Sequence, residues 1–255
     1  MASTLEVVDL GMIAFAEAWE LQKRVVAARK AGAIGDVLLF CEHPHVITQG
    51  RSGNRANLLA SENVLRQKGI EYFETTRGGD ITYHGPGQIV GYPILNLGAI
   101  RRDVVWYVRM LEEAMIRATA EFAIAAQREA EKTGIWVGRD GRSEKLAAIG
   151  VHISRWVTSH GFAYNVATDL RYFDLIVPCG IAGRKATSLE KLLGRCVVLH
   201  GLEFAVSAVE RESWPGRGKK HAKSIFRGSS GPGESRRQRL RRSSSSSWRN
   251  ACEPG

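Results

Sequence analysis

The stretch RGGDITYHGPGQIVGYP, residues 77–93, contains five glycines and two prolines, too many for one regular element. Polar side chains crowd between them, and glycines let a backbone approach a ligand closely and present its N–H groups. The stretch matches neither the GxxxxGK[ST] phosphate loop nor a GxGxxG turn that opens a helix. Its spacing alone is compatible with a glycine-rich surface hairpin or with a ligand-binding loop.

The chain on both sides of this stretch shows helical and strand patterns. Apolar residues recur every three or four positions over 12–30 and again over 102–125, which predicts two amphipathic helices. Short apolar runs bounded by turn residues predict strands over 36–41, 71–76, 88–95, 134–138, 145–153 and 161–166. Because several of these strands follow one another directly, the pattern favours an α+β fold with a mixed or antiparallel sheet flanked by helices.

A further helix start is predicted at TSLE, residues 187–190. This is the capping-box pattern, in which Thr187 accepts from backbone N–H groups and Glu190 reaches back to the cap. A short helix with Thr187 as its N-cap is therefore expected.

Composition limits the classes of protein. The 255 residues are 44% apolar and contain no long apolar run, which argues against a membrane-spanning helix. Glu6 and Asp9 precede the first basic residue, Lys23, so the start fits neither a secretory signal nor a transit peptide, and a cytoplasmic location is expected. The cysteines form no CxxC pair, so no metal site is predicted.

The formal charge of +10 is concentrated at the end of the chain. Residues 211–255 carry twelve Lys/Arg and three Glu, a net charge of +9. We therefore expect a folded domain over 1–214 and a basic Gly/Ser/Arg-rich tail over 215–255 that is disordered. The nearly neutral body argues against specific nucleic-acid binding, and the tail would hold polyanions only through salt-sensitive contacts.

Two residues have a chemistry that depends on their surroundings. Lys145 opens the apolar strand EKLAAIG, residues 144–150, whose small side chains leave room on the sheet surface. By itself, a lysine at a strand start is usually a solvated end residue. Cys179 lies in LIVPCGIAG, residues 175–183. A lone cysteine in an apolar segment is more often inert core than nucleophile, because reactivity requires a lowered pKa.

These three segments, in this order, resemble the LipB family of lipoyl(octanoyl) transferases. The family's signature loop is similar to Arg-Gly-Gly-x-x-Thr-Tyr/Phe-His-x-Pro-Gly-Gln-x-Val-x-Tyr-Pro, and every fixed position is met from Arg77 to Pro93. Later segments that resemble the family are KLAAIG (145–150), RWVTSHGFAYNV (155–166), PCGI (178–181) and ATSLE (186–190).

The resemblance implies a fold like the biotin/lipoate protein ligase catalytic domain and an acyltransferase that needs neither ATP nor a cofactor. It implies transfer of an octanoyl group from octanoyl-acyl carrier protein, through an acyl thioester on Cys179, to a lysine of lipoyl-domain proteins. Such acceptors are the glycine cleavage H protein and the E2 subunits of 2-oxoacid dehydrogenases, and the reaction is the first step of endogenous protein lipoylation. Lys145 would lower the pKa of the Cys179 thiol and move protons.

The resemblance also implies which residues contact the substrate. They are Arg77, Gly78, Gly79, Asp80, Ile81, Thr82, Tyr83 and His84, then Ala148, Ile149 and Gly150, then Gly161, Phe162 and Ala163. An apolar slot between these segments would contribute on the order of 0.8 kcal/mol per buried CH₂ group, so octanoyl thioesters should be preferred over butanoyl and palmitoyl. Backbone N–H groups near Gly150 or Gly180 would hold the oxyanion, and the sequence does not choose between them.

Two residues differ from the family's pattern, and two other classes of function are compatible with parts of the sequence. His152 and Tyr164 depart from the family's pattern and are expected to reshape a pocket wall. A biotin or lipoate ligase would activate a free acid with ATP and would need no catalytic cysteine. A non-catalytic acyl- or polyanion-binding protein would use the same loop together with the basic tail.

Overall fold

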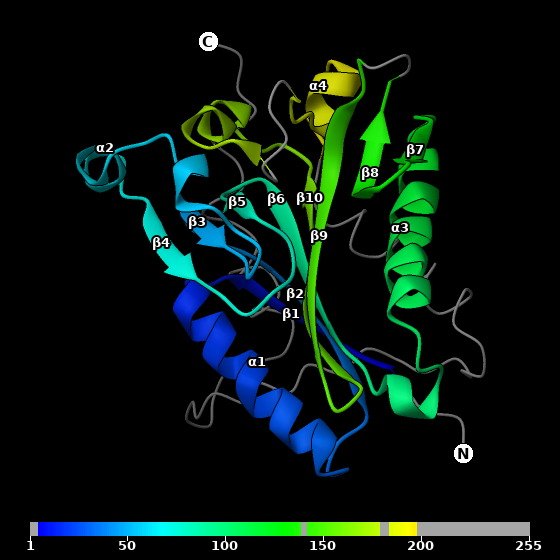
Figure 1. The fold of residues 1–255 in the computed structure, drawn as a ribbon. Helices are drawn as coiled ribbons and strands as arrows, with labels where there is room; N and C mark the ends of the chain where they lie inside the picture. Colours follow the sequence, from blue (N-terminus) through cyan, green and yellow to red (C-terminus); the bar gives the residue numbers. More distant parts are fainter. Residues whose placement is uncertain (1–4, 139–141, 179–183, 198–255) are drawn as a thin grey trace, which may run out of the picture. The chain divides into compact units, whose positions relative to one another are not determined.

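The computed structural model describes residues 5–138, 142–178 and 184–197. Cys179, Gly180 and the predicted tail over 215–255 lie outside the described residues. A seven-stranded sheet has the order β1-β2-β6-β10-β9-β8-β7, and a three-stranded sheet has the order β4-β3-β5. Strands β1 and β2 pair in parallel while the other neighbours of the large sheet are antiparallel, so the predicted mixed sheet is confirmed (Figure 1).

The bounds of the elements follow the sequence patterns closely. The large sheet consists of β1 (Leu5–Met12), β2 (Asp36–Glu42), β6 (Gln88–Ile94), β7 (Ala126–Glu129), β8 (Lys132–Val137), β9 (Glu144–Ser154) and β10 (Val157–Asn165). The small sheet consists of β3 (Val46–Gln49), β4 (Glu71–Glu74) and β5 (Ile81–His84). The helices are α1 (Phe15–Lys30), α2 (Glu62–Gln67), α3 (Val104–Ala120) and α4 (Leu189–Leu193). Among the described residues, no helix combines the length and apolarity needed to span a membrane.

Both faces of the large sheet are covered, which explains why every residue of β2 is buried. Leu38 and Phe40 point into the core beneath α3, whereas Val37, Leu39 and Cys41 point into the core beneath α1. Successive side chains of a strand alternate between faces, so one apolar run serves two cores. Helices α1 and α3 accordingly lie on opposite sides of the sheet (Figure 1).

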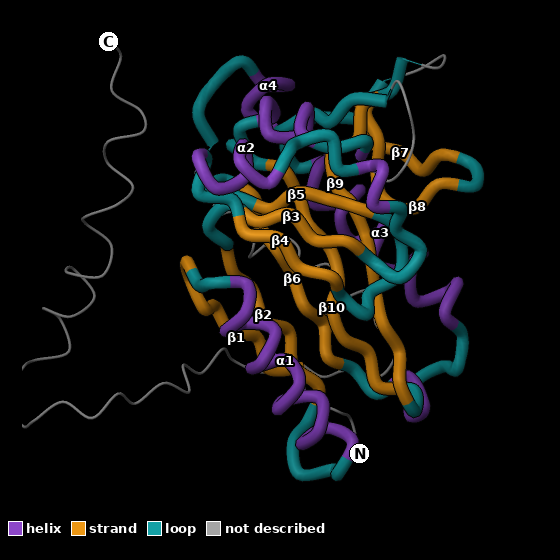
Figure 2. The backbone as a smooth tube through the Cα atoms, turned by 60° about the vertical axis from the view of Figure 1, so that its left-hand side comes forward, coloured by secondary structure: helices purple, strands orange, loops and turns teal. Residues whose placement is uncertain are grey.

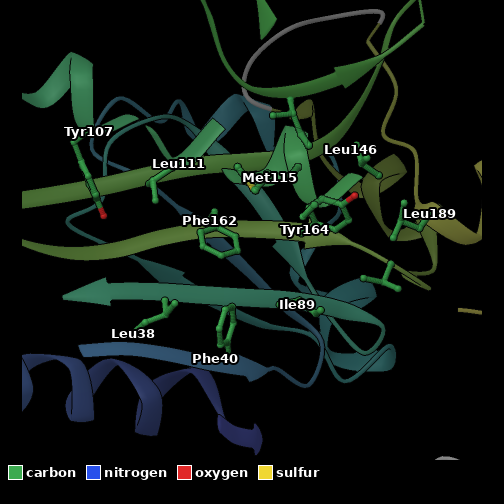
Figure 3. Packing of buried hydrophobic residues seen from close by; sticks show 14 of the residues in the cluster. Leu38, Phe40, Ile89, Tyr107, Leu111, Met115, Leu146, Phe162, Tyr164 and Leu189 are labelled. Atoms are coloured by element: carbon green, nitrogen blue, oxygen red, sulfur yellow. The ribbon is translucent and has the colours of Figure 1, made fainter. Parts of the chain in front are cut away.

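The core beneath α3 is the larger of the two. Leu111 and Met115 of α3 pack over Phe162 and Tyr164 of β10, as Figure 3 shows. The Tyr164 hydroxyl lies 2.7 Å from the hydroxyl of Thr119 at the end of α3. The expectation that Tyr164 reshapes a pocket wall is therefore wrong, because its ring faces α3 and is fully buried there.

The small sheet has a core of its own. Figure 2 shows its three strands side by side. Ile47, Ile81 and Tyr83 form its buried centre, and the Tyr83 ring stacks on Tyr172 with centroids 5.0 Å apart. The Tyr83 hydroxyl is 2.7 Å from Nδ1 of His45. Tyr83 thus stabilises the small sheet from the side that faces away from the cavity described below.

Helix α4 begins where the sequence predicts, but with a different cap. The N-cap is Ser188, whose hydroxyl accepts from the Lys191 backbone N–H at 3.3 Å. The assignment of Thr187 as the cap is wrong by one residue, because the backbone N–H of Thr187 donates to the carbonyl of Lys145 at 2.9 Å. Glu190 accepts from the backbone N–H of Val197 instead of closing a capping box.

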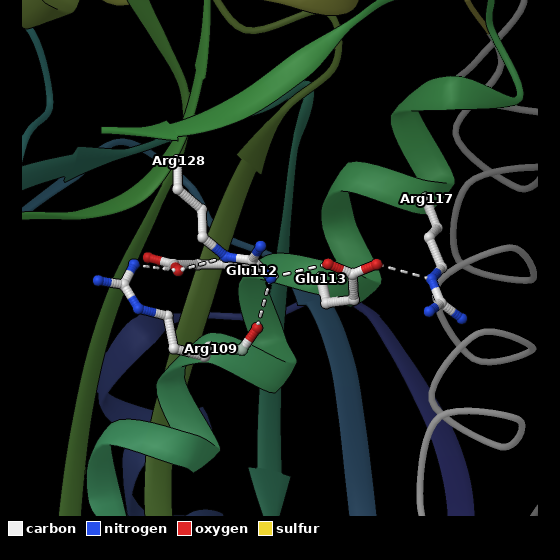
Figure 4. Close-up of polar contacts among 5 residues, drawn as sticks. All are labelled: Arg109, Glu112, Glu113, Arg117 and Arg128. Atoms are coloured by element: carbon white, nitrogen blue, oxygen red, sulfur yellow. Dashed lines mark hydrogen bonds and ion pairs between the residues drawn. The ribbon is translucent and has the colours of Figure 1, made fainter. Parts of the chain in front are cut away.

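A buried carboxylate fastens the β7–β8 hairpin to α3. Glu112 is fully buried and accepts from Arg109 at 2.7 Å, from Arg128 at 3.1 Å and from the backbone N–H of Gly134 at 3.0 Å. The adjacent Glu113 also pairs with Arg128 but stays partly exposed (Figure 4). Only Glu112 therefore satisfies a buried backbone donor.

Replacing Glu112 with alanine should lower the free energy of unfolding by about 3 kcal/mol, because the Gly134 N–H and two guanidinium groups lose a buried acceptor. Glu113→Ala is the matched control and should cost less than about 1 kcal/mol, since its ion pairs are solvated. Urea unfolding of both variants measures the difference. Equal losses would show that burial of the carboxylate is not what stabilises the hairpin.

Candidate active site

A cavity of about 330 Å³ is lined by residues of both sheets and of α1. The residues that the sequence singled out and that line it are Arg77, Gly79, Asp80, Ile81, Thr82, His84, Lys145, Ala148, Ile149, Gly150, Gly161, Phe162 and Ala163. Tyr83 and Gly78 do not line it. The structure therefore brings residues of 77–84, 145–150 and 161–163 together, although they lie up to about ninety positions apart in the chain.

The floor of this cavity consists of small residues in register. Ala148 of β9 pairs directly with Ala163 of β10, and Gly150 pairs with Gly161. All four line the cavity. Residues directly opposite on adjacent strands share a face. The small side chains of these two cross-strand pairs therefore leave space above this part of the sheet.

Gly150 also makes room for the loop that follows β4. A Cβ on Gly150 would lie 2.9 Å from the carbonyl oxygen of Gly78 and 3.1 Å from Cδ of Arg77. The Gly78 backbone N–H donates to the carbonyl of Val151 at 2.9 Å. Part of the space that the small residues of β9 leave open is thus occupied by the loop of residues 77–80, which lies directly on the strand.

The Arg77 guanidinium fixes this loop to the small sheet. It is buried, and it donates to the Thr48 carbonyl at 2.6 Å, to the Thr48 hydroxyl at 3.0 Å and to the Gly78 carbonyl at 3.1 Å. The Asp80 carboxylate accepts from the backbone N–H groups of Asn54 at 3.1 Å and Ile81 at 2.7 Å. These two charged side chains shape the loop through hydrogen bonds to neighbouring backbone and hydroxyl groups.

A chain of hydrogen bonds fixes the tautomer of His84. Gln88 donates its amide N–H groups to the Tyr83 carbonyl at 3.2 Å and to Asn165 at 2.9 Å, so its Oε1 is left to accept. Oε1 lies 2.7 Å from Nδ1 of His84, which therefore carries the proton. Nε2 of His84 is the acceptor, and it lies 3.3 Å from the Thr48 hydroxyl.

Three buried histidines near the cavity are held neutral. Burial lowers the pKa of His43 from 6.5 to about 4. Burial, followed by the neighbouring His43, lowers the pKa of His84 to about 3, and burial together with the Arg77 cation lowers the pKa of His160 to about 3. The neutral imidazoles of His84 and His160 thus line the part of the cavity next to the Arg77 guanidinium.

A β-bulge turns Lys145 toward the cavity. Strand β8 shifts from pairing Ile135 with Ala147 to pairing Trp136 with Lys145. In a regular strand Lys145 would share the face of Ala147, which is buried in the core beneath α3. The extra residue changes the face, and Lys145 lines the cavity together with Ala148.

Three cations surround one buried indole at this end of the cavity. The Lys145 Nζ lies 4.6 Å from the ring centroid of Trp136, Lys132 lies at 5.4 Å, and the Arg184 guanidinium lies at 5.8 Å. Glu129 pairs with Lys132 at 2.6 Å and with Arg184 at 3.4 Å. Cation–π contacts of this kind help to position the Lys145 ammonium group at this end of the cavity.

A second cavity, of about 20 Å³, adjoins the first. Lys145 lines both cavities. Pro178, the residue before Cys179, lines the second cavity, and so does Arg184 on the other side of the segment that is not described. Cys179 itself lies outside the described residues.

The chain that follows this segment is attached to the start of β9. The Lys145 backbone N–H donates to the carbonyl of Lys185 at 2.9 Å, and Ala186 forms a parallel bridge with Lys145. The Asn165 side chain donates to the carbonyl of Thr187 at 3.0 Å. Residues 185–187 are thereby held beside Lys145 and beside the end of β10.

The sequence missed several residues that line the main cavity. They are Phe15, Thr48, Val90, Tyr92, Glu131, Lys132, Thr133 and His160. Most of them come from elements whose faces could not be assigned without the sheet order. His152 does not line this cavity; it lines a separate groove between α1 and the far ends of β9 and β10, so its expected effect on the pocket wall is wrong.

Comparisons with known proteins show the family of the chain. Residues 14–207 match the lipoyl protein ligase A/B catalytic domain. The chain belongs to this family. The chain is an acyltransferase of that family, as the sequence predicts.

Its relatives include several octanoyltransferases. The octanoyltransferase of Acidobacterium capsulatum is 54% identical over 195 residues, which cover 73% of this chain and 79% of the relative. The octanoyltransferase of Solibacter usitatus is 55% identical over 184 residues, which cover 72% of this chain and 81% of the relative. The predicted resemblance is confirmed by these relatives.

Solved structures confirm the fold. The bi-partite lipoate protein ligase of Thermoplasma acidophilum superposes with a TM-score of 0.69 at 14% identity, covering 88% of each chain. A lipoate-protein ligase A bound with ATP superposes with a TM-score of 0.66 at 15% identity, covering 88% of this chain and 90% of that chain. At these identities the likeness extends to the fold alone.

The neutral histidines predict a loss of stability in mild acid. Below pH 6.5 the unfolded chain binds protons on His43, His84 and His160, whereas the folded protein binds them only near pH 3 to 4. The contribution of these neutral histidines to the free energy of unfolding is complete above about pH 6.5. It is lost as the pH falls, by up to about 1.4 kcal/mol per pH unit for each histidine. Urea unfolding between about pH 5 and 7.5 measures the slope.

The His43→Asn variant is the control for this assignment. It removes one of the three titrating groups, so the slope of unfolding free energy against pH should fall by about one third. A wild-type stability that does not change over this range would contradict the neutral state of the buried histidines.

Proposed function

We propose that this enzyme transfers an octanoyl group from octanoyl-acyl carrier protein to a lysine of lipoyl-domain proteins through an acyl thioester on Cys179, without ATP. The observation that carries the proposal is the position of Lys145 where the two cavities meet, with Pro178 and Arg184, which flank the Cys179 segment, lining the second. The residues over 1–214 form the catalytic domain in this proposal.

The charges around Trp136 support a nucleophilic thiolate. A free thiol with a pKa near 8.5 is only a few per cent ionised at neutral pH, and adjacent cations favour its thiolate. Lys145 and Arg184 both lie near the same indole and line the second cavity together with Pro178. The site is therefore electropositive where the nucleophile is proposed to act.

The first step exchanges one thioester for another. The Cys179 thiolate attacks the carbonyl carbon of the carrier thioester, the bond from that carbon to the carrier sulfur breaks, and the carrier leaves as a thiol after taking a proton from Lys145. Bonds of the same kind form and break, so this step is close to equilibrium. No nucleotide is needed to drive it.

The second step forms an amide. Once Cys179 carries the acyl group, its negative charge is gone and the neutral amine of Lys145 acts as a base toward the incoming lysine. The amine of the incoming lysine attacks the acyl-cysteine carbonyl and gives a proton to Lys145, the carbon–sulfur bond breaks, and Cys179 leaves as a thiolate beside the reprotonated Lys145. Amide formation from a thioester is favourable and makes the overall transfer irreversible. Backbone N–H groups near Gly150 or Gly180 would stabilise the oxyanion in both steps.

The main cavity supplies the acyl slot in this proposal. Ala148, Ala163 and Ile149 line it, and small side chains in two cross-strand pairs leave room for an alkyl chain. Burial of a seven-carbon tail at about 0.8 kcal/mol per CH₂ group contributes several kcal/mol of acyl affinity. The acceptors are lipoyl-domain proteins of the H-protein and E2 kinds, and the reaction is proposed to occur in the cytoplasm.

Intact-protein mass spectrometry tests the covalent step. After mixing with octanoyl-acyl carrier protein without ATP, the wild type should gain the mass of one octanoyl group, and Cys179→Ala should gain none. Cys41→Ala is the matched control, since Cys41 is buried on the α1 side of the sheet, and it should be acylated like the wild type. Acylation that requires ATP would favour a ligase, and no acylation under either condition would contradict the proposal.

The Lys145→Arg variant separates the two steps. Arginine keeps the positive charge that favours the Cys179 thiolate, and the leaving carrier thiolate can take its proton from water, so acylation of Cys179 should persist. Because arginine cannot act as a base, transfer to a lipoyl domain should fall at least about 100-fold. Lys191→Arg is the control, because Lys191 pairs with Glu144 at 2.7 Å outside both cavities. Single-turnover measurement of each step gives the comparison. Full transfer by Lys145→Arg would exclude Lys145 as the base.

A further inference from the structure

The acyl cavity ends at a single buried side chain. A groove of about 360 Å³ between α1 and the far ends of β9 and β10 lies beyond the main cavity. Of the residues that line these two spaces, His160 is common to both. His160 is only 3% exposed, so its ring separates the two spaces instead of projecting into solvent.

An unusual backbone conformation puts His160 in this position. In a regular strand His160 would share the face of Phe162 and Tyr164, both of which belong to the core beneath α3. The φ angle of His160 is +55°, in the left-handed region that non-glycine residues rarely occupy. The change of conformation turns the side chain to the cavity face. A strained residue at the edge of a cavity indicates that the position serves a function.

Contacts from two elements hold the ring in place. Nε2 of His160 lies 3.3 Å from the Thr76 hydroxyl, and the His160 backbone N–H donates to Oε1 of Gln22 at 3.0 Å. The Trp19 ring lies 6.2 Å away on the groove side. The wall is thus supported by α1 and by the chain that leads into the loop of residues 77–80.

The length of the floor agrees with an eight-carbon chain. His160 pairs with Val151, three residues beyond the Ala148–Ala163 pair of the cavity floor. At about 3.4 Å per residue these two pairs lie roughly 10 Å apart. An extended octanoyl group has seven C–C bonds of about 1.5 Å and spans roughly 9 Å.

We propose that His160 is the specificity-determining wall of the acyl slot, which stops the methyl end of the chain and excludes acyl groups much longer than octanoyl. This inference rests on the proposed acyl transfer. The groove beyond the wall is lined in part by Trp19, Val26 and Ala27, so removal of the ring would join an apolar extension to the slot.

The His160→Gly variant tests the wall, and glycine also adopts the left-handed conformation without strain. Acylation by carrier-bound thioesters of six to sixteen carbons is measured for both proteins. The ratio of the tetradecanoyl rate to the octanoyl rate should rise at least about tenfold in His160→Gly. Ser159→Ala is the matched control, since Ser159 lines only the groove, and its ratio should equal that of the wild type.

Binding of free fatty acids separates this proposal from the proposed reaction. Titration calorimetry with octanoate and tetradecanoate needs no turnover, and the relative affinity for tetradecanoate should rise in His160→Gly as the rate ratio does. If the wild type transfers no acyl group but the binding ratio still shifts in His160→Gly, the proposed acyl transfer is wrong and the proposed role of His160 in limiting chain length is supported. A folded His160→Gly protein, with a cooperative thermal transition, whose length profile is unchanged in both measurements would overturn the proposal.

Discussion

The close contact between the loop of residues 77–80 and strand β9 is the constraint on which the rest of the site depends. It needs a glycine at position 150, because a Cβ there would meet the Gly78 carbonyl and the Arg77 side chain. With the loop seated, the Arg77 guanidinium reaches Thr48 of the small sheet, and Thr48 in turn meets His84. One missing side chain on the large sheet thus allows the two sheets to enclose a cavity between them.

Electrostatics divides the cavity into two ends. At one end Lys145 lies with other cations around Trp136, in surroundings suited to an anionic nucleophile. Toward the other end His84 and His160 are neutral, because burial makes their protonation costly. Neutral imidazoles suit an alkyl chain, while the Arg77 cation next to them is held by the carbonyl groups of Thr48 and Gly78. The positive surroundings of Lys145 suit sulfur and carbonyl chemistry. The strain at His160, on the order of 1–3 kcal/mol, is tolerated because packing on both sides fixes the residue.

The sequence predicted the fold class, both long helices and the three segments that line the cavity, because periodicity and a long motif carry that information. It did not predict the face of Lys145, which depends on a bulge set by the register of β8 against β9. It also missed His160, since alternation along β10 places that residue on the wrong face. The error at Thr187 has the same origin, because pairing with Lys145 takes the backbone group that a cap would have used. Tertiary pairing decided each of these positions.

The bridge between Lys145 and Ala186 also bears on the order of folding. It joins positions about forty residues apart, whereas the β9–β10 hairpin closes over a two-residue turn. Local contacts form with a smaller loss of chain entropy than distant ones, so the hairpin and its apolar floor should assemble before the chain around Pro178 and Arg184 reaches Lys145. A partly folded chain would then lack the cations that we propose to act on the Cys179 thiol. In the proposed reaction, cysteine reactivity would then arise only with the completed domain, which would limit unwanted acylation and oxidation of newly made protein.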